Sequence, residues 1–139
     1  MFNVSRSSGL FACLLCGWFL LTSPAHAFDL NGAWSTNADQ CGKVFAKNGN
    51  KISFAQFSDE FGGGFVADGN DIRSKTVRCT IKSKKETGDT IEFQAVCASE
   101  IMATNTNLRL KILDADTVSR VFTDPSLAGM ELSFHRCAM

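Results

Sequence analysis

The sequence predicts an all-β, antiparallel domain. After residue 27, apolar and polar residues alternate with a period of two, which is typical of strands with one buried face. Short clusters of Gly, Asn, Asp and Ser interrupt this alternation at close intervals, as expected for turns. Four cysteines lie in the same part of the chain, and an even number favours two disulfides in an oxidising compartment.

The first 27 residues resemble a secretory signal peptide. Arg6 precedes an apolar run over 9–22, and the small-residue pattern Ala25-His26-Ala27 follows it. The run is shorter than the roughly 20 residues that a membrane-spanning helix requires. Lipidation at Cys13 is less favoured, because too little apolar sequence precedes it. We therefore expect a signal peptide at 1–27 and one exported domain at 28–139, periplasmic or secreted, with no membrane span.

The charge balance argues against a polyanionic partner. The chain has 14 Lys and Arg residues against 14 Asp and Glu residues. Its one basic cluster, Lys82, Lys84 and Lys85, lies beside Glu86 and Asp89, where a solvated turn is expected. No nucleic-acid partner is therefore predicted.

Two hairpins give the clearest strand pattern, each with an apolar and a polar face. The first joins 77–82 to 91–97 across a turn at 84–89, and the second joins 108–112 to 118–122 across a turn at 114–117. Further strands are expected at 31–35, 51–57, 64–67 and 130–137, so the count is eight or nine. Residues 39–47 fit either a short helix that begins on Asn37 or a strand in a hairpin around Asn48-Gly49-Asn50.

The two ends of the domain carry a family resemblance. Gly32-Ala33-Trp34 on the first strand resembles the G-x-W entry motif of calycins, the superfamily of lipocalins and avidins. In those families an Arg on the last strand packs across this Trp, and Arg136 is the matching position. The resemblance implies a small antiparallel up-and-down β-barrel of about eight strands, in which Trp34 and Arg136 close one end through a cation–π contact.

Two states of the barrel interior are compatible with this resemblance. A calycin-like barrel holds a small apolar ligand at its mouth, which would make the protein a non-enzymatic binding protein. After residue 27 the chain has nine Phe and no Tyr, and this composition favours an interior filled by its own side chains.

A glycine-rich loop supplies an alternative function. Phe57, Phe61 and Phe65 are spaced by four around Gly62-Gly63-Gly64. As a contact loop, these rings would bind an envelope protein, and the chain would act as an inhibitor of an envelope-targeting hydrolase such as a lysozyme or protease. The favoured interpretation is a glycine-rich bulge whose Phe side chains turn into the core.

No residue pattern indicates catalysis or a cofactor. His135 is the only His after residue 27 and is expected on the outer face of the last strand. The acidic pairs, such as Asp68 with Asp71 and Asp114 with Asp116, fall in predicted turns, where Asp is favoured for its backbone hydrogen bonds. We expect no enzyme activity, no metal and no cofactor.

The four cysteines are expected to form disulfides, and their pairing is open among three possibilities. Cys41, Cys79, Cys97 and Cys137 are spaced far more widely than the C-x2-4-C pairs of structural zinc sites. One register of the first hairpin places Cys79 opposite Cys97, although pairing between distant strands is equally compatible with the sequence.

Overall fold

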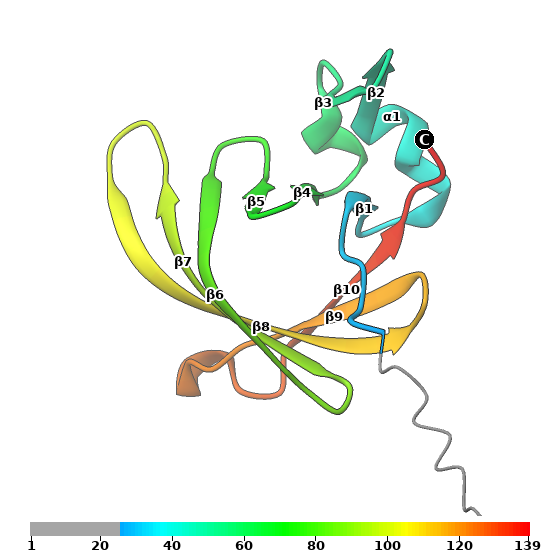
Figure 1. Cartoon of the computed structure of the whole chain (residues 1–139). Coiled ribbons are helices and arrows are strands. Elements are labelled where there is room, and N and C mark those ends of the chain that lie inside the picture. The colour runs from blue at the N-terminus through cyan, green and yellow to red at the C-terminus, as the bar shows by residue number, and fades with distance from the viewer. Residues whose placement is uncertain (1–25) are drawn as a thin grey trace, which may run out of the picture.

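The structure, a computed structural model, describes residues 26–139. The predicted signal peptide therefore lies, except for its last two residues, outside the described residues. The predicted all-β fold is confirmed: eight antiparallel strands close into a barrel (Figure 1). Among residues 26–139, no helix is long and apolar enough to cross a membrane.

The barrel strands follow one another around the wall in the order β1-β10-β9-β8-β7-β6-β5-β4, and β4 pairs again with β1. Their bounds are β1 (Gly32–Ser35), β4 (Gly64–Asp68), β5 (Asp71–Arg73), β6 (Arg78–Thr87), β7 (Thr90–Ala98), β8 (Ala103–Asp114), β9 (Thr117–Val121) and β10 (Glu131–Arg136). Because consecutive strands are antiparallel, their connections alternate between the two ends. We call the end with the β4–β5, β6–β7 and β8–β9 turns the closed end, and the opposite end the open end.

The ambiguous segment 39–47 contains both of the expected structures. The Asn37 side chain caps a 3-10 turn, η1 (Ala38–Gln40), by accepting a hydrogen bond from the Asp39 N–H at 3.1 Å. The chain continues as α1 (Cys41–Val44) and then as a separate hairpin of β2 (Phe45–Asn48) and β3 (Lys51–Phe54). Two further 3-10 turns are η2 (Ser58–Phe61) and η3 (Pro125–Leu127).

The β6–β7 hairpin differs from the expected pattern in its register. Residues 84–87 continue β6 instead of forming a turn, which shrinks to Gly88 and Asp89, with Gly88 at φ +61°. The pairing shifts between Ile81 and Ser83, so Lys82 occupies a β-bulge. One extra residue exchanges the two faces of a strand, and Lys84 now stands opposite the buried Phe93.

Two hydrophobic cores lie on opposite sides of β1 and β4. The first fills part of the barrel and includes Trp34, Phe65 and Phe134. The second lies outside the barrel, where α1 and the β2–β3 hairpin pack on Ala33 and Val66. Figure 1 shows this outer layer beside the barrel, next to the C-terminus.

The structure resolves the cysteine pairing that the sequence left open. Cys41 in α1 bonds to Cys137 after β10, and this disulfide attaches the outer layer to the barrel. Cys79 in β6 bonds to Cys97 in β7, directly across the hairpin. The expectation of two disulfides is confirmed.

Candidate ligand site at the open end of the barrel

Aromatic side chains pack around Trp34 at the closed end. Trp34 is fully buried, and its Nε1–H donates a hydrogen bond to the Leu30 carbonyl at 2.8 Å. Phe65 stacks on its ring at a centroid distance of 6.0 Å, and Phe28 packs at 6.2 Å. The guanidinium carbon of Arg136 lies 4.3 Å from the centroid of the Trp34 ring. The expected cation–π contact is therefore present.

The remaining contacts of Arg136 tie two segments of the closed end together. Its Nη1 donates to the Asn31 carbonyl at 2.8 Å, and its Nη2 to the Asp29 carbonyl at 2.7 Å. On the β8–β9 turn, Nη2 also donates to the Ala115 carbonyl at 3.2 Å, and Nε to an Asp116 carboxylate oxygen at 3.1 Å. The guanidinium thus makes four hydrogen bonds, as a planar fork of donors allows.

The bulge in β6 turns two charged side chains, Lys84 and Glu86, to the inner face of the strand near the closed end. Lys84 donates from Nζ to the Phe28 carbonyl at 3.3 Å, and the Phe28 N–H donates to Glu86 Oε2 at 3.4 Å. The hydrogen bond from Lys84 to the Glu86 carboxylate lowers the pKa of Glu86 below its ordinary value. These contacts hold the N-terminal segment over the barrel.

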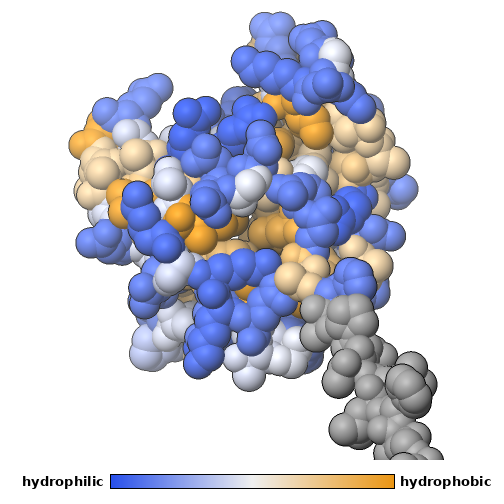
Figure 2. Space-filling view, in the orientation of Figure 1, coloured by the Kyte–Doolittle hydropathy of each residue, from blue (hydrophilic) through white to orange (hydrophobic). Residues whose placement is uncertain are grey.

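The open end contains a cavity of about 370 Å³. This volume lies within the range of ligand pockets, and most of its lining is apolar. The lining residues are Gly64, Phe65, Ile72, Ser74, Val77, Cys79, Phe93, Cys97, Thr106, Leu108, Leu110, Arg120 and Phe134. Figure 2 shows apolar side chains gathered in a hollow of the molecule, framed by hydrophilic residues.

The expectation of a filled interior is therefore correct only for the packed cluster around Trp34. Five of the nine Phe side chains after residue 27 lie outside the barrel core: Phe45, Phe54 and Phe61 in the outer core, Phe57 on the surface and Phe122 beside Arg120. A period-two pattern does not distinguish a side chain inside the barrel from one under an outer layer. Phe rings that were expected to fill the barrel therefore pack in the outer layer.

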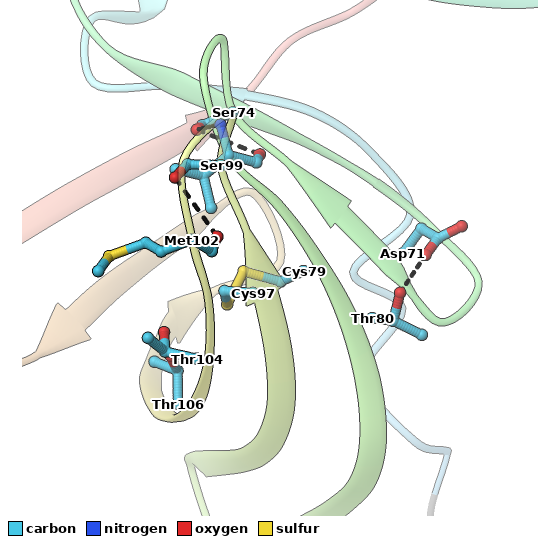
Figure 3. The surroundings of a disulfide bond; sticks show 10 residues. Asp71, Ser74, Cys79, Thr80, Cys97, Ser99, Met102, Thr104 and Thr106 are labelled. Atoms are coloured by element: carbon cyan, nitrogen blue, oxygen red, sulfur yellow. Dashed lines mark hydrogen bonds between the residues drawn. A yellow bond between two sulfur atoms is a disulfide. The ribbon is translucent and has the colours of Figure 1, made fainter.

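The Cys79–Cys97 disulfide forms part of the cavity wall near its rim. Above it, the Ser74 Oγ accepts a hydrogen bond from the Val77 N–H at 3.2 Å, and the Ser99 N–H donates to the Met102 carbonyl at 2.9 Å. Figure 3 shows the disulfide between β6 and β7, close to both of these turns. The rim is thus fixed by one covalent bond and by hydrogen-bonded turns.

Among residues 26–139, Arg120 is the only charged residue that lines the cavity. It lies on β9, two residues from the fully buried Val118, and stands opposite Leu110 on one neighbouring strand and Leu132 on the other. Its guanidinium carbon is 4.9 Å from the centroid of the Phe122 ring. Within the part of the chain that the structure describes, its side chain makes no hydrogen bond or ion pair.

The candidate contact loop does not form one aromatic surface. Phe57 is 59% exposed, whereas Phe65 is buried in the barrel core. Phe61 packs against the outer core, with Lys43 Nζ 4.9 Å from its ring centroid. The strand expected to reach Phe57 ends at Phe54, and Phe57 adopts a left-handed backbone with φ +59°. Of the three rings of the candidate contact loop, only Phe57 is largely exposed.

The residues considered for catalysis or metal binding remain dispersed. His135 is half-buried on the outer side of β10, opposite Ser35 and Thr117 on the neighbouring strands. Asp71 accepts a hydrogen bond across the β5–β6 pair from the Thr80 hydroxyl at 3.2 Å. Asp114 accepts one from the Asp116 N–H at 2.8 Å, as turn residues do. In the described range 26–139, no group of three or more His, Cys, Asp or Glu side chains is placed to hold a metal ion.

Sequence reasoning missed Arg120 as a site residue, although its signal was present. In the predicted strand 118–122, Arg120 shares the apolar face with Val118 and Phe122. A charged residue on an inward face is unusual and can mark a site. Strand β5 and the polar first half of β8, Ala103–Asn107, were also missed.

No family model matches this chain, and neither the curated proteins nor the solved structures contain a significant match. The function of the protein is therefore inferred from the barrel and its cavity.

Proposed function

We propose that this protein is an exported, calycin-like binding protein, periplasmic or secreted, that holds a small apolar ligand in the open end of its barrel. The calycin resemblance rests on Trp34 and Arg136, which occupy the closed end. Export is supported by the resemblance of residues 1–27 to a signal peptide and by the two disulfides, which are typical of oxidising compartments.

The observation that carries this proposal is the apolar cavity of about 370 Å³ at the open end. Apolar surface that faces a hollow contributes little to folding, because it loses the dispersion contacts that a packed core provides. An apolar ligand would replace those contacts. Binding requires no catalytic group, which agrees with the dispersed positions of His135 and the acidic residues.

The test is binding of the apolar fluorophore N-phenyl-1-naphthylamine to the purified domain. We expect saturable binding with one site per chain. Leu108→Trp places a bulky indole on the cavity wall, and we expect it to weaken binding at least about tenfold by occupying the site.

Leu113→Trp is the matched control, because Leu113 lies on the same strand but is 51% exposed and does not line the cavity. This variant should bind the fluorophore like the unmodified protein. Absence of saturable binding to the unmodified protein, or equal loss in both variants, would refute the proposed function.

A second candidate function is inhibition of an envelope-targeting hydrolase through an exposed aromatic residue. Phe57 favours this function, because its ring is 59% exposed and its backbone is left-handed. That conformation is costly for a bulky residue and is found mainly at functional sites. The variant Phe57→Gly suits this backbone and removes the ring. It should abolish inhibition of a sensitive lysozyme or protease without lowering the melting temperature; unchanged inhibition would exclude Phe57 as the contact.

A further inference from the structure

The cavity combines an apolar lining with one unpaired cation. Arg120 lies on the inward face of β9, between Leu110 and Leu132 of the adjoining strands. Ser74 and Thr106 are polar but uncharged, and no carboxylate of the described residues lines the cavity beside this guanidinium. A half-buried charge with apolar neighbours is unfavourable unless it gains a partner.

The contacts of Arg120 do not indicate a structural role for this residue. Arg136, the other inward arginine, has four acceptors and a Trp beneath it. Arg120 has only the Phe122 ring, and its five N–H donors find no acceptor within residues 26–139. A leucine at this position would continue the apolar wall without the cost of desolvating a charge.

We infer that the ligand is a small amphipathic anion, with an apolar body in the cavity and one anionic group on Arg120. This inference rests on the proposed function and specifies the ligand's chemistry. A guanidinium binds a carboxylate, sulfonate or phosphate through two parallel hydrogen bonds, which gives orientation as well as affinity. The cavity has room for about a dozen water molecules. This suits a body of two or three rings or a short acyl chain.

The test uses two fluorophores that differ by one sulfonate. N-phenyl-1-naphthylamine is neutral, and 8-anilino-1-naphthalenesulfonate carries the same rings with a sulfonate group. We expect Arg120→Met to weaken binding of the sulfonate roughly 10- to 100-fold, the value of a charge-assisted hydrogen bond, and to change binding of the neutral compound less than about twofold.

Arg109→Met is the matched control, since it removes a guanidinium from the neighbouring strand. Arg109 is a half-buried residue like Arg120, but it pairs with Glu92 and does not line the cavity. Its loss should leave binding of both compounds unchanged. Competition between the two fluorophores on the unmodified protein should show that they share one site.

The possible outcomes separate this inference from the proposed function. If the neutral compound binds the cavity but Arg120→Met leaves the sulfonate's affinity unchanged, the inference is wrong and the proposed function stands. Equal loss of sulfonate binding in Arg109→Met would attribute the effect to general charge and also overturn it. If neither compound binds the unmodified protein, both fail. Thermal unfolding and a second variant, Arg120→Gln, establish that a loss of binding does not reflect misfolding.

Discussion

The two ends of the barrel each contain an inward arginine, but the two arginines have opposite surroundings. At the closed end, Arg136 lies on Trp34 and donates to three carbonyls and one carboxylate. At the open end, Arg120 borders a cavity of about 370 Å³ and has no polar partner among residues 26–139. At the closed end, packing and hydrogen bonds stabilise the fold. At the open end, the apolar lining and the guanidinium of Arg120 remain available to contact a ligand.

The two ends also differ in how their walls are held together. Interior side chains join the strands of the closed end, with Trp34 fully buried at the centre. A hollow cannot supply such contacts, and at the open end a covalent bond, Cys79–Cys97, links two strands of the wall. This difference predicts distinct responses to substitution at the two ends.

Trp34→Ala should have the largest effect, lowering the free energy of unfolding by about 3–5 kcal/mol, since it leaves a large cavity in a packed region. It also removes the ring beneath Arg136. The matched change at the open end, Leu108→Ala, should cost only about 1 kcal/mol, because Leu108 is half-buried beside an existing cavity. Chemical denaturation of both variants measures the difference, and equal losses would contradict the contrast between the ends.

Replacing both Cys79 and Cys97 with Ser should destabilise the protein by about 3 kcal/mol, the chain-entropy value for the 18-residue separation of the two cysteines. Because this disulfide is part of the cavity wall, binding of N-phenyl-1-naphthylamine should weaken as well. Differential scanning calorimetry and fluorescence titration of the oxidised proteins provide the two measurements. An unchanged melting temperature would show that the bond does not stabilise the open end.

The two arginines provide the next comparison. Arg136→Met should lower the free energy of unfolding by about 2 kcal/mol, because it removes the charged hydrogen bonds that join the N-terminal segment to the β8–β9 turn. Arg120→Met should change it by less than about 0.5 kcal/mol, since no hydrogen bond or ion pair of the described residues is lost. Urea denaturation measures both. A loss of 2 kcal/mol in Arg120→Met would assign that residue a structural role.

The sequence predicted the closed end better than the open end, and the reason is physical. Trp34, Arg136 and the period-two strands are local patterns with a direct structural meaning, and one hairpin register already placed Cys79 opposite Cys97. The cavity depends on volumes summed over strands that are distant in sequence. Residues 36–63 lie outside the barrel wall and form the outer layer. No local pattern shows that Phe45 and Phe54 pack in this layer and not inside the barrel.

The β6 bulge illustrates the same limit at the scale of one residue. Period-two alternation predicted a continuous apolar face through Cys79 and Ile81, and the turn was expected from Lys84 onward. The extra residue at Lys82 turns Lys84 and Glu86 to the inner face of β6, where they contact Phe28 at the closed end. A bulge leaves no distinct signature in one sequence, so the role of these charges became visible only in the structure.

Glu86→Gln should give the smallest effect, a loss below about 0.5 kcal/mol at pH 7, because the Lys84–Glu86 pair is partly exposed to solvent. Lys84 lowers the pKa of Glu86 in the folded state, so the stabilisation is complete above the ordinary pKa of Glu and disappears as the pH falls through the folded-state pKa. The difference between the variant and the unmodified protein should therefore vanish in acid.

A chain beginning at Phe28 should make the effect of Glu86→Gln at pH 7 larger. Its new α-ammonium group would lie beside the Glu86 carboxylate, since the Phe28 nitrogen is 3.4 Å from Glu86 Oε2. Urea denaturation of both chain forms between pH 3 and pH 7 measures it; a loss that is independent of pH would show that the Glu86 charge does not hold the N-terminal segment over the closed end.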